Sequence, residues 1–120
     1  MTTQEVANRY AELEKQGLWH QNQEELYADD CESIEPAHAA AMGMSNVKGK
    51  EAIIEKGKAF NAMIEEMHGG YCSAPVVGGN YFSVAMGMDV TMKGAPRMNM
   101  DEIAVFKVKD GKIVSEHFFF

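Results

Sequence analysis

A chain of 120 residues is long enough for one compact domain with a single core, and a second domain is not expected. Its 46% hydrophobic and 24% charged residues are typical of an ordinary folded protein rather than a disordered or fibrous one. Acidic residues exceed basic ones by 18 − 11 = 7, and the lysines and arginines form no cluster. Nucleic acid is therefore not an expected partner.

The cysteines and histidines show no spacing that is typical of a metal site. Cys31 and Cys72 lack CxxC spacing, and the four histidines form no HxxxH or HExxH pattern. There is also no GxGxxG motif after a strand. We expect no metal or cofactor and two reduced thiols. The first residues do not resemble a signal peptide, and no apolar run approaches ~20 residues, so we expect a cytoplasmic protein without a membrane anchor.

Helices are expected in the first part of the chain, followed by a short strand. Thr2 and Glu5 have the spacing of a capping box, and apolar residues at helical spacing, Tyr10 among them, continue until Gly17. A second short helix is expected over 22–27. The strand over 31–35 ends in Glu35, which the following proline biases toward an extended backbone.

The second part is expected to contain one long helix and then only strands. Residues 36–46 have no clear period and are predicted to form a loop over the mouth of a cavity. An amphipathic helix is expected over 50–67, with Gly57 inside it at a cost of ~1 kcal/mol. The apolar period then changes to two, which predicts strands over 71–77, 80–92, 98–109 and 113–120.

The segment 26–36, Leu-Tyr-Ala-Asp-Asp-Cys-Glu-Ser-Ile-Glu-Pro, follows a helix that carries Tyr10 and precedes two hairpin turns, Lys-Gly-Ala-Pro and Asp-Gly-Lys-Ile. In this order the elements resemble the ketosteroid isomerases of the SnoaL-like, NTF2-like group over nearly the whole chain. The resemblance implies one domain over 1–120 with an α+β fold. In that fold, three N-terminal helices pack on a curved antiparallel sheet and form a cone that encloses an apolar pocket.

The same resemblance implies roles for site residues. Glu35 stands where the isomerases carry their general base, which in them is an aspartate, and Tyr10 resembles their oxyanion-binding tyrosine. Their second oxyanion donor is a protonated aspartate. An ungapped match from the Gly111 turn places Ile103 at that position, and a shift by one residue gives Ala104. Neither side chain can donate a hydrogen bond.

The register of the hairpins sorts side chains into two faces. If Asp110 and Gly111 form a two-residue turn, the residue numbers of two facing residues in that hairpin add up to 221. If Gly94 and Ala95 form the preceding turn, the numbers in that hairpin add up to 189. This register places Asp101 and Glu116 on the cavity face as further candidate catalytic acids. The expected pocket lining consists of the large residues on inward stripes: Trp19, Tyr27, Phe60, Met63, Met86, Met88, Ile103 and Phe118.

The opposite face of the sheet is expected to be too apolar to remain in water, which predicts a homodimer. The residues assigned to it are Tyr81, Asp89, Glu102, Ala104, Phe106, His117 and Phe119. Among them, Asp89, Glu102 and His117 could form either an acid–His–acid relay or a polar cluster within the subunit contact.

A carboxylate base, a phenol and an apolar pocket are what proton abstraction next to a carbonyl group requires. The sequence therefore predicts a small-molecule enzyme that performs cofactor-independent acid–base chemistry, isomerase-like or cyclase-like, on a hydrophobic carbonyl compound. In the alternative, the same fold is a non-catalytic ligand-binding or dimeric assembly protein, with Tyr10 a core tyrosine and Glu35 a strand-end acid.

Overall fold

The computed structural model describes residues 1–120 and shows an α+β fold. The helices are α1 (Thr3–Lys15), α2 (Trp19–Leu26), α3 (Lys50–Ala62) and a 3₁₀ helix, η1 (Ala37–Met42). The strands are β1 (Tyr27–Ile34), β2 (Val47–Lys48), β3 (Ile64–Cys72), β4 (Val76–Gly78), β5 (Tyr81–Met92), β6 (Arg97–Lys109) and β7 (Lys112–Phe119). None of the helices is long and apolar enough to cross a membrane.

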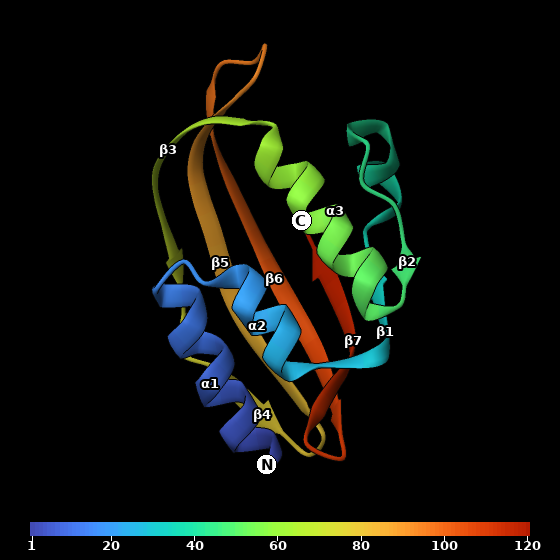
Figure 1. Cartoon of the computed structure of the whole chain (residues 1–120). Helices are drawn as coiled ribbons and strands as arrows, with labels where there is room; N and C mark the ends of the chain where they lie inside the picture. The colour runs from blue at the N-terminus through green and yellow to red at the C-terminus, as the bar shows by residue number, and fades with distance from the viewer.

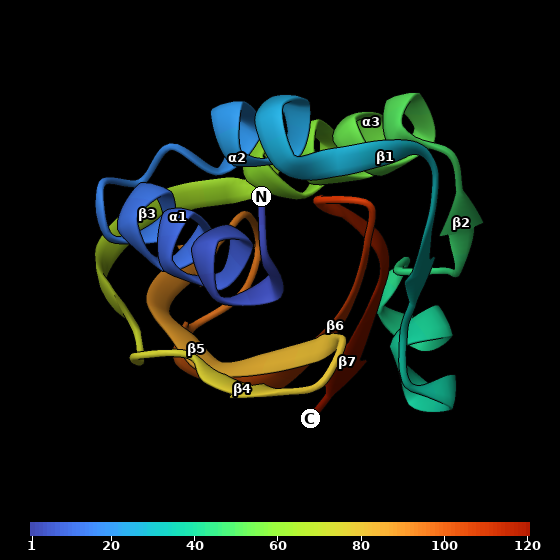
Figure 2. The same cartoon turned by 90° about the horizontal axis from the view of Figure 1, so that it is seen from below.

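One curved, mixed sheet forms the body of the molecule, and α1, α2 and α3 pack on its concave side (Figure 1). The strand order is β2-β1-β7-β6-β5-β3, and β4 pairs with β5 off this path. The pairing of β1 with β7 is parallel, while all other pairings are antiparallel, so the expectation of an antiparallel sheet needs this correction. The sheet curls around α1 when it is viewed from below (Figure 2).

Packing of α1 on β5 and β6 fills one end of the curved sheet. The predicted capping box is present at the start of this helix. Thr2 Oγ1 accepts a hydrogen bond from the Glu5 N–H at 3.1 Å, and Glu5 Oε1 accepts one from the Thr2 N–H at 2.9 Å. The Tyr10 ring lies 4.5 Å from the Phe106 ring and 5.7 Å from the Phe82 ring, and all three residues are buried. These aromatic contacts close that end of the concave face with a solid core.

The long helix ends earlier than expected, at Ala62 rather than near residue 67. Ile64 to Met67 instead begin β3, which pairs with β5. The register of this pairing shifts twice, between Ile64 and Glu66 and between Met67 and Gly69. Such bulges break the period of two. For this reason the apolar residues at the start of the strand looked like one more helical turn.

The hairpin register differs from the expected one by one residue on β6. Asp110 and Gly111 do form the predicted turn, with φ values of 52° and 75°. The β5–β6 pairs, however, sum to 188, as in Met86 opposite Glu102, which centres the turn on Gly94. A slip of one residue exchanges the two faces of a strand. Asp101 and Ile103 therefore point outward, whereas Glu102, Ala104 and Phe106 point inward.

The side chains of β7 that were expected to point inward do so, because a bulge between β6 and β7 compensates for the one-residue slip of β6. Near the turn the residue numbers of β6–β7 pairs sum to 221, as predicted, but a bulge between Lys107 and Val108 changes the sum to 222, as in Phe106 opposite Glu116. Glu116 and Phe118 accordingly point inward, as expected from the sequence. The predicted Asp89, Glu102 and His117 cluster does not form, because Glu102 lies on the opposite face from the other two.

Candidate functional site

Three glutamates lie within electrostatic range of a fourth, Glu102, which faces inward on the concave side of the sheet. The four come from four elements: Glu14 from α1, Glu35 from the end of β1, Glu102 from β6 and Glu116 from β7. Each of the other three raises the pKa of Glu102 by its charge, which places all of them within electrostatic range of it. Lys56 of α3 is the cation among them, and it lowers the pKa of both Glu102 and Glu116.

Glu116 is fully enclosed and has a hydrogen-bond donor on each carboxyl oxygen. The Tyr27 hydroxyl donates to Oε1, and the Ser33 hydroxyl donates to Oε2 at 2.8 Å. Burial raises the pKa of Glu116, while the hydrogen bonds from Tyr27 and Ser33 and the charge of Lys56 oppose that rise. Burial and the neighbouring carboxyl of Glu116 raise the pKa of Tyr27 well above its usual value, so the phenol stays protonated.

Glu35 forms an ion pair with Lys56 at the end of β1. Its Oε1 lies 2.9 Å from Lys56 Nζ, and the Glu35 side chain is only 6% exposed. Lys56 also donates to Ser33 Oγ at 2.7 Å and approaches the carbonyl oxygen of Ser45 at 3.4 Å. The Glu35 backbone N–H donates to Asn46 Oδ1 at 2.7 Å, which fixes the chain after the strand. The contact with Lys56 therefore keeps the Glu35 side chain, which has little solvent access, in one position.

Glu102 differs from the other three acids because its carboxyl has no hydrogen-bond or ion-pair partner. It is partly buried and faces inward between Met100 and Ala104 on β6. Burial, followed by the charges of Glu35, Glu116 and Glu14, raises its pKa to about 7. At neutral pH, this carboxyl is poised to take up or release a proton. The hairpin register expected from the sequence placed Glu102 on the outer face, whereas its pairing opposite Met86 turns it inward.

Tyr10 provides a buried phenol near the same group of acids. Its hydroxyl donates to the sulfur of Met86 at 3.6 Å, and a thioether is a weak acceptor. Burial, then the charges of Glu14 and Glu116, raises the pKa of Tyr10 well above its usual value. Glu14 accepts a hydrogen bond from Asn22 Nδ2 at 3.0 Å, and its burial raises the pKa of its carboxyl. The Tyr10 hydroxyl is thus a neutral donor without a strong partner.

Several predicted site residues lie elsewhere. Asp101 is exposed on the outer face, where it accepts a hydrogen bond from Tyr71 at 2.8 Å, and Ile103 is 45% exposed on the same face. Both follow from the one-residue slip of β6. Trp19 packs between α2 and α3, where a Cβ added at Gly57 would come within 2.8 Å of its ring. The glycine that seemed costly inside α3 makes room for this indole.

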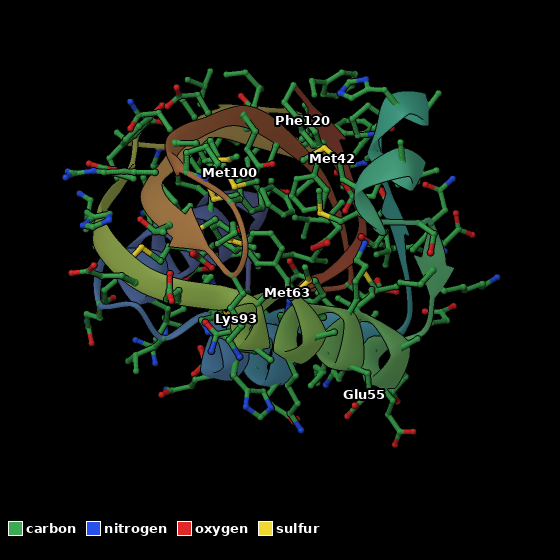
Figure 3. The ribbon with its side chains drawn as sticks, turned by 90° about the horizontal axis from the view of Figure 1, so that it is seen from above. Met42, Glu55, Met63, Lys93, Met100 and Phe120 are labelled. Atoms are coloured by element: carbon green, nitrogen blue, oxygen red, sulfur yellow. The ribbon has the colours of Figure 1, made fainter.

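The other residues that were expected to line the pocket lie either in the buried core or at partly exposed positions. Tyr27 belongs to the buried core, and Met86 and Phe118 pack against it. Phe60 and Met88 are half-buried, whereas Met63 is 51% exposed. The view from above labels Met63 beside the end of α3, across from Met42, Met100 and Phe120 (Figure 3).

The predicted apolar pocket remains a prediction. Two depressions of the surface lie away from the concave face. One, of about 180 Å³, is on the outer face around Gly70, Gly87 and Asp101, and the other, of about 380 Å³, is beside the first residues and the β6–β7 turn. No three His, Cys, Asp or Glu side chains are arranged to hold a metal ion.

Comparisons with known proteins identify relatives over the whole chain. The model of the SnoaL-like domain family matches residues 1–120. A crystal structure of a candidate SnoaL-like polyketide cyclase from Mesorhizobium loti is 36% identical, with all of both chains covered and a TM-score of 0.91. Among curated proteins, no sequence matches this chain.

More distant structures share the fold at lower identity. A candidate polyketide cyclase from Pseudomonas putida is 14% identical with a TM-score of 0.72, and 100% of this chain and 92% of that chain are covered. A Catenulispora acidiphila protein of ketosteroid isomerase-like fold, in complex with trimethylamine, is 20% identical with a TM-score of 0.68 over 84% and 73% of the two chains. At these identities the likeness concerns the fold alone.

Proposed function

Because the chain belongs to the SnoaL-like domain family, we propose that it is a small-molecule enzyme that performs cofactor-independent acid–base chemistry on a hydrophobic carbonyl compound. The observation that carries this proposal is Glu102, an inward carboxyl without a partner whose pKa lies near 7. The Mesorhizobium loti relative, a candidate polyketide cyclase, supports an isomerase-like or cyclase-like reaction.

The proposed reaction divides the chemistry between a base and two donors. Glu35, held in position by Lys56, removes a proton from the carbon next to the substrate carbonyl, so that the C–H bond breaks and an enolate forms. Tyr10 and the protonated form of Glu102 donate hydrogen bonds to the enolate oxygen as its charge develops. In a substrate whose C=C bond is conjugated with the enolate, return of the proton from Glu35 to the far carbon of the dienolate moves that C=C bond next to the carbonyl group and gives the isomer.

Glu102 supplies the second donor that the sequence analysis found missing at Ile103 and Ala104. The methionines of the concave face are suited to an apolar substrate, because flexible thioethers repack around ligands of different shape. A substrate oxygen is a stronger hydrogen-bond acceptor for Tyr10 than its present partner, the Met86 sulfur.

Deuterium exchange next to a carbonyl group tests the proposal. A panel of hydrophobic ketones and 1,3-diketones is incubated with the protein in D₂O and followed by NMR. Glu35→Gln is expected to abolish catalysed exchange while ligand affinity stays nearly unchanged, and Tyr10→Phe to lower the rate about 10²–10³-fold. Glu65→Gln is the matched control, since Glu65 is an exposed β3 residue without side-chain partners.

The outcome separates the enzyme from the binding-protein alternative. Ligand binding by the parent without any exchange would favour a non-catalytic binding protein. Exchange that survives Glu35→Gln would exclude Glu35 as the base and point to Glu102 or Glu116.

We also propose that the protein forms a homodimer through the outer face of β3, β5, β6 and β7. Ile103 is 45% exposed there and Phe119 49%, and the His117 ring stacks on Phe119 at 4.3 Å. The four strands have 9, 12, 13 and 8 residues. With strands ~4.8 Å apart and a rise of ~3.3 Å per residue, their outer face covers roughly 670 Å². That area lies within the ~600–1,000 Å² per partner that a stable interface buries.

Light scattering at micromolar concentration tests the dimer. We expect a dimeric mass for the parent and a monomeric mass for Ile103→Asp, with Lys93→Asp, in the exposed β5–β6 turn, as control. A monodisperse monomer of the parent would refute this proposal.

A further inference from the structure

Lys56 links Glu35 to Ser33, the hydrogen-bond partner of Glu116, although its sequence context does not single it out. Its ammonium group has three acceptors: Glu35 Oε1 at 2.9 Å, Ser33 Oγ at 2.7 Å and the Ser45 carbonyl oxygen at 3.4 Å. The Lys56 side chain is 18% exposed, so these protein groups replace most of its water.

The bond from Lys56 fixes the direction of the Ser33 hydroxyl. A serine hydroxyl has a single proton, and Ser33 Oγ already accepts from an ammonium group that has no acceptor capacity of its own. The Ser33 proton must therefore point to Glu116 Oε2, 2.8 Å away. Because Tyr27 donates to Oε1 of the same carboxyl, both Glu116 oxygens are occupied by donors.

This geometry leaves one of the inward acids without a fixed role. Glu35 accepts a hydrogen bond from Lys56. Glu116 accepts hydrogen bonds from Ser33 and Tyr27. Glu14 accepts one from Asn22. Only Glu102 has no partner.

We propose that Lys56 is the positioning residue of the site: it holds Glu35 directly and Glu116 through Ser33, which leaves Glu102 as the inward carboxyl free to exchange a proton. This inference rests on the proposed acid–base function, but it makes a structural claim that can be measured without a substrate. Glu116 is then an anchor for Tyr27 and Ser33 rather than a base.

NMR titration of ¹³C-labelled glutamate side chains tests this claim. The groups that face Glu102 are Glu14 from α1, Glu35 from β1, Glu116 from β7 and Lys56 from α3. Loss of the ammonium group in Lys56→Met makes their combined charge more negative. The titration midpoint of the Glu102 carboxyl is therefore expected to rise by about half a pH unit. This rise is smaller than the one expected for an acid that pairs directly with the lysine.

Lys56→Arg keeps the charge and is expected to return the midpoint close to that of the parent. Lys58→Met, an exposed lysine on the same helix, should leave it unchanged. If Lys56→Met does not fold, Ser33→Ala provides the second test. It removes one donor from Glu116 and should raise the Glu116 midpoint, because the Ser33 bond lowers the pKa of that carboxyl.

The exchange assay adds a functional readout. Lys56→Met should lower kcat at least 10-fold with little change in KM, and Lys56→Arg should restore part of the rate. An unchanged Glu102 midpoint in folded Lys56→Met, or an unchanged Glu116 midpoint in Ser33→Ala, would overturn the inference. If the midpoints shift as expected while the parent catalyses no exchange, the positioning role stands and the proposed function fails.

Discussion

Replacement of Glu102 by glutamine should stabilise the protein in a way that depends on pH. Glutamine keeps the shape of the protonated acid but cannot ionise, so the variant avoids the cost of a charged carboxylate beside three other acids. In the parent, Glu102 has its pKa raised from 4.5 to about 7, first by burial and then by the charge of Glu35. The size of the effect follows from that difference.

The sign and magnitude follow from proton linkage. Below pH 4.5, Glu102 is protonated in both the folded and the unfolded chain and has no effect. Between 4.5 and about 7, the unfolded chain releases the proton while the folded protein retains it, so the stability of the parent falls as pH rises. A difference of 2.5 pH units at 1.36 kcal/mol each corresponds to about 3 kcal/mol in total.

Urea denaturation of parent and variant between pH 4.5 and about 8.5 measures this effect. Glu102→Gln should match the parent at the acidic end and exceed it by about 3 kcal/mol at the alkaline end. With an m value of about 1–3 kcal/mol/M, the urea midpoint should shift by about 1–3 M. Glu65→Gln, on the exposed side of β3, should show no such trend. A stability difference that is constant with pH would refute the reasoning.

Three further predictions concern the core, the helix contact and the thiols. Phe106→Ala should lower the free energy of unfolding by about 3–5 kcal/mol in urea denaturation, because the fully buried ring stacks on Phe82 and packs at a tilt against Tyr10. Gly57→Ala should displace the Trp19 indole toward water and shift its fluorescence to longer wavelength, since the new Cβ would lie 2.8 Å from the ring. Burial raises the pKa of Cys31 to about 12 and of Cys72 to about 11, so a thiol reagent such as Ellman's should react with both only after denaturation.

The local signals in the sequence identified most of the fold. The capping box at Thr2 and Glu5 and the Asp110–Gly111 turn both occur where they were predicted, since each depends on a few adjacent residues. The family resemblance supplied the α+β architecture. The parallel pairing of β1 with β7 was missed because no local pattern distinguishes parallel from antiparallel neighbours.

The candidate site was harder to predict because it depends on register. A turn centred on Gly94 instead of between Gly94 and Ala95 moves Glu102 inward and Ile103 outward, and nothing in the alternating pattern of β6 distinguishes the two. Lys56 was missed for another reason. It lies on α3 among other charged residues, and its contacts with Glu35 and Ser33 join residues more than 20 positions apart.

Titration of the parent protein, with its glutamate carboxyl carbons observed by ¹³C NMR, tests the central claim of an inward acid–base group most directly. One carboxyl is expected to titrate at about pH 7, and its signal should disappear in Glu102→Gln. Titration of the Glu102 carboxyl near the ordinary value of 4.5 would contradict the account, because that carboxyl would then be in water rather than among the buried acids.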